Sequence, residues 1–307
     1  MSQPASVVEN DLARVDPLAR LKLVSAVVIV LLSWAGSYVA IGIAVQELSP
    51  ASFALARVGG GALALIAMMP FVPGAQLRLP RRRDLPLIAA MAMMAFPIYQ
   101  IAISTGQQVV SPGVSSVLIA TLPIFATLIA VFTLKERPSE REWVGIAIAF
   151  LGVALLVTVR EGRFALEPAA LFVLLAAISG AGFMVVQRQL TRRYNSLELT
   201  LWGLWIGAIA LLPFAPSLLA EMRGASSATW LSVVYVAVLP TALGYLLWAY
   251  VLKMLTAAKA TSLLYIVPPI AFTLAWLITG QAPGGMDIIS SVIVICGVAL
   301  VQSRRRG

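Results

Sequence analysis

The amino-acid sequence predicts an all-α membrane protein built from ten transmembrane helices, which form two inverted repeats of five helices each. The first observation behind this fold class is composition. Of the 307 residues, 60% are hydrophobic and only 11% are charged, and the mean hydropathy is +0.94. A soluble domain carries about 25% charged residues. Apolar runs long enough to cross the hydrocarbon core of a bilayer recur along the chain, so a soluble fold is excluded.

The second observation is an internal repeat, which divides the chain in two. Residues 115–157 form an apolar segment, a charged turn and a second apolar segment, and a later stretch of the chain repeats this pattern. At a shift of 146 positions, Pro123 falls on Pro269 and Tyr99 falls on Tyr245. Repetition at this scale indicates two copies of one structural unit.

Ten hydrophobic segments are predicted to span the membrane, and the short links between them make successive helices antiparallel neighbours. The expected spans are 22–44, 50–72, 85–104, 112–134, 141–159, 167–187, 197–216, 230–252, 259–279 and 286–303. The predicted organisation is a cytoplasmic N-terminal tail (1–21), a first five-helix repeat (22–159), a second, inverted repeat (160–303) and a basic cytoplasmic tail (304–307).

Lys and Arg residues are distributed unevenly between the two sides of the predicted bundle. Eighteen of the 22 lie in the tails and alternate loops, whereas the opposite loops contain only Arg160, Arg163 and Arg223. Because cytoplasmic loops are rich in Lys and Arg, both termini are expected in the cytoplasm of a bacterial cell, with the protein in its inner (plasma) membrane. Five spans is an odd number, so the second repeat enters the bilayer upside down. Inverted repeats are a common transporter design, with the substrate site near the midplane.

Arg57 is the only charged residue well inside a predicted span. A buried charge in a membrane is costly, so it is expected to face a cavity, cap carbonyl groups or reach back to the interface. Two interpretations stay open: a structural anchor, or a cation that attracts a substrate carboxylate.

Aromatic and hydroxyl residues at mid-membrane depth form the rest of the candidate site. Trp34, Ser37 and Tyr38 share one face of the first span, because residues three and four positions apart are neighbours on a helix. Trp and Tyr often mark the membrane interface instead. However, a buried indole or hydroxyl needs a hydrogen-bond partner, which favours a cavity. The residues expected to line a substrate cavity are Trp34, Ser37, Tyr38, Tyr99, Gln100, Ser115, Ser116, Tyr245, Trp248 and Tyr265.

Pro123 and Pro269 lie in the middle of their predicted helices, at matching places in the two repeats. Each removes a helical hydrogen bond, so a kink is expected, and the repeat favours a paired hinge or gate over two purely structural kinks. Gly145 and Ala149 form a small-xxx-small pair that is expected to serve packing within a monomer, although a homodimer stays open.

Several functional classes lack the residues that they need. The chain has no His and a single Cys, Cys296, so no metal-ligand cluster or cofactor site is predicted. No acid, base and nucleophile set indicates an enzyme. The net charge of +9 is explained by cytoplasmic loops rather than by nucleic-acid binding, and the expected partners are lipids and a small-molecule substrate. No Asp or Glu lies in the middle of a span, which favours facilitated transport over proton coupling.

A set of short motifs occurs along the chain: Trp34 to Ile41 in the first span, Arg57 after Pro50, Pro123-Ile124-Phe125, Glu136-Arg137, Gly145 and Gly152-Val153. Together these motifs resemble the EamA family of the drug/metabolite transporter superfamily, and the resemblance covers residues 24–303. It implies ten helices around a central cavity that opens alternately to either side. Gln281-Ala282 and Gly180-Ala181-Gly182 depart from the family pattern, and the first departure puts an acidic gating contact in the second repeat in doubt.

Within that family the resemblance is to bacterial amino-acid exporters, including those of aromatic amino acids. The functional hypothesis is therefore an inner-membrane exporter of amino acids and related metabolites, which works by alternating access and facilitated diffusion. The alternative is a proton-coupled exporter of cationic drugs. Cations favour carboxylates and aromatic cages, and the spans offer only the aromatic side chains.

Overall fold

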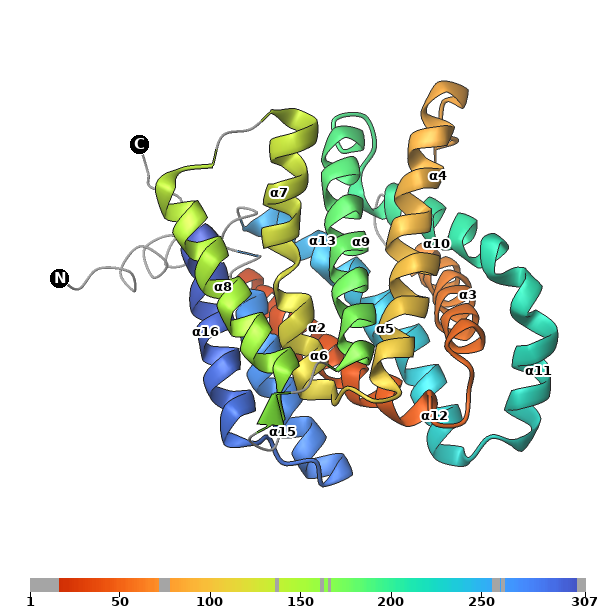
Figure 1. Cartoon of the computed structure of the whole chain (residues 1–307). Helices are drawn as coiled ribbons and strands as arrows, with labels where there is room; N and C mark the ends of the chain where they lie inside the picture. Colours follow the sequence, from red (N-terminus) through yellow and green to blue (C-terminus); the bar gives the residue numbers. More distant parts are fainter. Residues whose placement is uncertain are drawn as a thin grey trace.

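A computed structural model describes residues 17–71, 78–135, 138–160, 163–164, 167–255, 260 and 263–302, which are mostly helical (Figure 1). Most of the N-terminal tail, the Glu136-Arg137 motif and the C-terminal basic tail lie outside these ranges. Within them, nine helices are long and apolar enough to cross a membrane, and a shorter apolar helix, Leu264–Thr279, brings the number to ten. The predicted all-α class with ten spans is confirmed. The seventh span is longer than expected and runs from Ser196 to Gly224.

The elements follow the predicted order of spans. The first repeat contains α2 (Pro17–Ala44), α3 (Pro50–Met68), η1 (Met69–Phe71), η2 (Arg82–Asp84), α4 (Leu85–Met93), η3 (Met94–Ile98), α5 (Tyr99–Gln107), α6 (Pro112–Ala120), α7 (Leu122–Leu134) and α8 (Glu140–Thr158). A short antiparallel hairpin of β1 (Val159–Arg160) and β2 (Arg163–Phe164) follows. The second repeat contains α9 (Pro168–Leu190), α10 (Ser196–Leu211), η4 (Leu212–Phe214), α11 (Ala215–Gly224), α12 (Ser227–Val236), η5 (Ala237–Leu243), α13 (Gly244–Met254), η6 (Leu264–Ile266), α15 (Val267–Thr279) and α16 (Gly285–Gln302).

Several helices begin where the sequence places a capping residue. The side chain of Ser49 accepts a hydrogen bond from the Ser52 amide at the start of α3, and Ser111 does the same for α6, each followed by a proline in the first turn. Asn195 begins α10 with a reciprocal capping box. These caps satisfy amide groups that have no partner within the helix, so they fix where each span begins.

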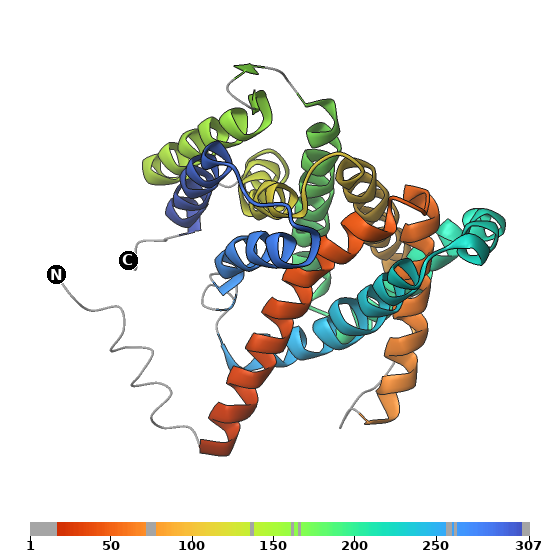
Figure 2. The same ribbon diagram turned by 90° about the horizontal axis from the view of Figure 1, so that it is seen from below.

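The repeats pack against each other in the pattern that a two-fold pseudo-symmetry requires. The third span (α5) packs on the sixth (α9), and its counterpart, the eighth span (α12, α13), packs on the first (α2). The fourth span (α6) packs on α9 just as the ninth (α15) packs on α2. The fifth and tenth spans, α8 and α16, pair with each other at one edge of the bundle, away from α10 and α11 (Figure 2). These contacts recur when each span is exchanged for its repeat partner, and because each repeat has five spans the two copies are inverted.

Small residues allow α8 and α16 to approach closely. A Cβ added to Gly145 would lie 2.8 Å from the main-chain oxygen of Gly297, and a Cβ added to Gly152 would lie 2.7 Å from the amide nitrogen of Val294. Both distances are too short for any side chain. The Gly145 and Ala149 pair is therefore used for packing between the two repeats of one chain.

Five spans are interrupted, and the seventh is broken by η4 between α10 and α11. The third and eighth spans contain the π-helical segments η3 and η5, which include Pro97 and Pro240. No break was predicted from the sequence at either proline, although a proline inside a span removes a helical hydrogen bond and so favours a break. The fourth span is interrupted at Thr121, so Pro123 falls in the first turn of α7. In the ninth span η6 precedes α15, and Pro269 is the third residue of α15.

Candidate functional site

A cavity of about 440 Å³ lies between the two repeats. Among the residues that the structure describes, nine of the ten spans contribute side chains to its wall, and only α8 contributes none. The cavity is thus a joint product of both repeats, since neither half alone could enclose it.

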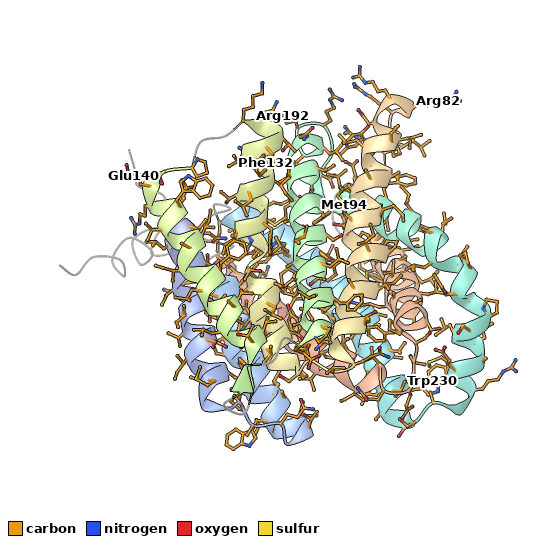
Figure 3. The ribbon with its side chains drawn as sticks, in the orientation of Figure 1. Arg82, Met94, Phe132, Glu140, Arg192 and Trp230 are labelled. Carbon is orange, nitrogen blue, oxygen red and sulfur yellow. The ribbon has the colours of Figure 1, made fainter. Side chains whose placement is uncertain are left out.

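The cavity reaches one end of the bundle and not the other. Arg82 and Arg192 lie at one end, which we call the basic face, and Trp230 lies at the other, the opposite face (Figure 3). Gln187, Ser196 and Gln302 line the cavity and lie at or near the ends of α9, α10 and α16 on the basic face. No lining residue comes from the described residues of the loops at the opposite face.

Close packing shuts the bundle toward the opposite face. A Cβ added to Gly113, in the first turn of α6, would lie 2.1 Å from the ring of Phe272 on α15. A Cβ added to Gly106, near the end of α5, would lie 2.9 Å from the main-chain oxygen of Ala169 on α9. Glycine is required at both positions because the helices approach so closely. The structure therefore represents a state that is open to the basic face.

Arg57 is the only charged residue among the described residues that line the cavity. Its Nε donates a hydrogen bond of 3.3 Å to Oγ1 of Thr241, and that hydroxyl donates in turn to the Val236 carbonyl at 2.6 Å. Thr241 belongs to η5, so the other repeat positions the arginine. No described carboxylate lies within ion-pair distance of the guanidinium. The remaining N–H groups are available to an anion.

An aromatic group forms the wall on the side of the first and eighth spans. The ring of Trp34 lies 5.2 Å from that of Trp248 and 6.1 Å from that of Tyr245, between centroids. The Trp34 indole donates a hydrogen bond of 3.0 Å to the carbonyl of Pro240, within the π-helical segment η5. The rings present apolar faces with negative π-electron density, on which a flat apolar group or a cation can rest.

Most of the residues expected at the site line this cavity. They are Trp34, Ser37, Tyr38, Arg57, Tyr99, Gln100, Ser116, Pro123, Tyr245, Trp248 and Tyr265. Two do not: Ser115 is fully buried outside the described wall, and Pro269 is exposed on the outer surface, whereas its neighbour Pro268 lines the cavity. Tyr265 donates a hydrogen bond of 3.3 Å to the Val298 carbonyl, which holds η6, the segment before α15, to α16.

Sequence reasoning missed part of the site. Thr241, which binds Arg57, comes from a helix 184 residues further along the chain, and nothing in its sequence context indicates that contact. Gln187 and Gln302 line the cavity near helix ends, where a polar side chain is ordinary. Pro240 offered a usable signal, because a proline within a span leaves a carbonyl in need of a partner.

Comparison with known proteins settles the family. A model of the EamA-like transporter family matches residues 21–158 and again residues 167–303. The chain belongs to the EamA-like transporter family. It is consequently a multi-pass membrane transporter and not an enzyme.

Individual relatives cover nearly the whole chain. It is 32% identical over 287 residues to a protein of Streptantibioticus cattleyicolor named as a probable terminal-alkyne amino-acid exporter, covering 93% of this chain and 95% of the relative. It is 34% identical to the uncharacterized transporter YdfC of Bacillus subtilis, covering 86% of each. A Salmonella typhimurium protein named as a probable amino-acid metabolite efflux pump is 25% identical, over 61% of this chain and 66% of that one. One solved crystal structure shares the fold at a TM-score of 0.57 and 20% identity, over 92% of this chain and 99% of that one.

Proposed function

We propose that this transporter exports amino acids and related metabolites, aromatic amino acids among them, from the bacterial cytoplasm across the inner membrane. Alternating access moves the substrate through the central cavity by facilitated diffusion. The observation that carries this proposal is Arg57, a cation without a described carboxylate partner, in a cavity with an aromatic wall.

The charge in the cavity favours a substrate carboxylate. A half-buried guanidinium that keeps N–H donors gains from a carboxylate, whose two oxygens can accept a pair of parallel hydrogen bonds. The ammonium group or an aromatic side chain of the same substrate can then rest on Trp34 or Trp248. A volume of about 440 Å³ lies within the roughly 300–1,000 Å³ range of small-molecule sites.

The relatives support the same class of substrate, because two of them are named for amino acids or amino-acid metabolites. The alternative of a proton-coupled exporter of cationic drugs is less well supported. Such a carrier needs a buried acidic group to bind the cation or the proton, and no Asp or Glu lines the described wall. Arg57 would in addition repel a cation.

Counterflow into proteoliposomes tests the proposal. Liposomes are loaded with unlabelled phenylalanine, and the entry of labelled phenylalanine is compared with the entry of labelled phenethylamine, which lacks the carboxylate. We expect entry of the amino acid alone, with no change when a pH gradient is imposed. Entry of the amine in preference to the amino acid, or entry only with a pH gradient, would favour the alternative.

A further inference from the structure

One edge of α5 carries buried polar side chains whose oxygens lack partners. Gln100, Ser104 and Gln107 are 4%, 0% and 3% exposed, and they lie at positions i, i+4 and i+7, so they share one edge of the helix. Gln100 Oε1, Ser104 Oγ and Gln107 Oε1 have no hydrogen-bond partner within the described part of the chain. We call these three residues the polar edge of α5.

Several other hydroxyl groups of this bundle donate to a carbonyl of their own helix. Ser37 donates to the carbonyl three residues before it, and so does Ser116. Thr105, the neighbour of Ser104, donates to the Ile101 carbonyl at 2.8 Å. Ser104 makes no such bond, although a helix offers the same carbonyl to every serine. A buried polar group without a partner is destabilising, and a partner in another state of the protein would offset that cost for Ser104.

The polar edge leads away from the cavity toward the closed end of the bundle. Gln100 lines the cavity, and Gln107 is the last residue of α5, at the opposite face. Seven residues of helix span about 10 Å, roughly a third of the hydrocarbon core. Gln107 Nε2 donates to the Tyr38 carbonyl at 3.1 Å, so this end of the edge faces α2, the helix that carries Trp34.

We propose that the polar edge of α5 is the closed half of the transport route. In the state open to the opposite face, Ser104 and the two glutamine oxygens accept hydrogen bonds from the substrate's ammonium group and from the water that accompanies it. This inference rests on the proposed function. It assigns a substrate path to Ser104 and Gln107, which the cavity of the present state does not reach.

Alanine substitution separates this role from a structural one. Ser290 of α16 is the matched control, because it is also 0% exposed and its Oγ also lacks a partner, but it does not line the cavity. Both S104A and S290A remove an unpartnered hydroxyl, so both are expected to raise the melting temperature. Only S104A is expected to slow phenylalanine counterflow, by roughly three- to tenfold, the factor that one lost hydrogen bond gives.

Thiol labelling gives an independent readout. In a C296A background, S104C and S290C are treated with a membrane-impermeant maleimide added at the opposite face, with and without phenylalanine. We expect S104C alone to react, and faster while substrate is being transported. Wild-type counterflow in the same vesicles tests the proposed function itself. If that flux is normal while S104C stays unlabelled, or S104A matches S290A in rate, the route is overturned and the proposed function stands.

Discussion

At the scale of single residues, Arg57 is compatible with both interpretations that the sequence left open, a structural anchor and a cation that attracts a substrate carboxylate. It is anchored, because Nε donates to Thr241 across the repeat interface, and it is also presented to the cavity, because it belongs to the cavity wall. One hydrogen bond holds the guanidinium at its Nε, and no described carboxylate pairs with its terminal nitrogens. An arginine suits this double role better than a lysine. Its planar guanidinium can donate one N–H to Thr241 while its other N–H groups donate to a carboxylate.

Replacement of Arg57 should therefore weaken substrate binding. In R57Q the charge is lost, and the KM for phenylalanine should rise by roughly 10- to 100-fold, the factor expected from a lost charge-assisted hydrogen bond of about 1.5–3 kcal/mol. T241V keeps the charge but removes its positioning partner, so a smaller rise is expected. Concentration-dependent counterflow measures both. An unchanged KM in R57Q, with normal folding by size-exclusion chromatography, would leave Arg57 a structural anchor.

Trp34 shows what a single sequence can and cannot predict at this scale. Its depth and its spacing from Ser37 and Tyr38 predict a place in a cavity wall, and the structure puts all three there. The hydrogen bond from its indole to the Pro240 carbonyl joins the first span to the eighth, 206 positions along the chain. No local pattern encodes a partner at that separation. Trp34 is consequently a structural contact as well as a wall residue.

At the scale of elements, α6 and α15 form the barrier on the closed side. They are the fourth and ninth spans, which the pseudo-symmetry relates to each other. Their contact at Gly113 and Phe272 leaves no room for a Cβ. A state open to the opposite face needs these helices to separate there, because the barrier lies between the cavity and that face.

A side chain at Gly113 should therefore act as a wedge. G113V cannot be accommodated against the Phe272 ring without a shift of α6 or α15, so it should move the population toward the state open to the opposite face. The measurement is maleimide labelling of S104C at that face in a C296A background, which should become fast without substrate. F272A should reverse the effect, because it removes the clashing ring. If labelling of S104C is unchanged by a correctly folded G113V, α6 and α15 do not form the barrier.

Loops at both ends of the bundle hold the repeats together in symmetry-related ways. At the basic face, Asp84 accepts a hydrogen bond from the Tyr194 hydroxyl at 2.8 Å and pairs with Arg193 at 2.7 Å. At the opposite face, Glu47 accepts a hydrogen bond of 2.8 Å from the Ser226 amide. The contact of Asp84 joins the loop between the second and third spans to the loop between the sixth and seventh. The contact of Glu47 joins the loop between the first and second spans to the loop between the seventh and eighth. Exchange of the repeats converts one pair of loops into the other.

The contact at Glu47 should make stability depend on pH. The hydrogen bond from the Ser226 amide lowers the pKa of this carboxyl below its usual value, because the ionised form is the better acceptor. Its contribution is therefore present above the unfolded-state pKa and is lost as the pH falls through the lower folded-state pKa. The melting temperature of the wild type should exceed that of E47Q at neutral pH, and the difference should vanish in acid. A difference in melting temperature that persists in acid would mean that the contact does not depend on the negative charge of Glu47.

At the scale of the whole molecule, much could be predicted because the membrane restricts the possibilities. Apolar length fixes the number of spans, and the odd number per repeat fixes their inversion. The pairing of spans across the repeats could not be predicted, since lipid-facing and bundle-facing apolar residues look alike in sequence. Gly106 and Gly113 illustrate this. In the sequence each resembles an ordinary glycine of a loop or a helix end, and only the structure shows that Gly106 packs against α9 and Gly113 against Phe272. The direction in which the cavity opens depends on those same contacts.

That direction, together with the charge distribution, yields a prediction for the cell. The cavity opens at the face where Arg82 and Arg192 lie (Figure 3), and the positive-inside rule predicts that this face is cytoplasmic, so that an export substrate would enter directly. Green fluorescent protein fused after Gly307 should fluoresce, because it folds in the cytoplasm. Alkaline phosphatase inserted between Ala225 and Ser226, in the loop that precedes α12, should be active, because it folds in the periplasm. The reverse pair of results would place the open cavity toward the periplasm, and loading of substrate for export could not then occur in the state described here.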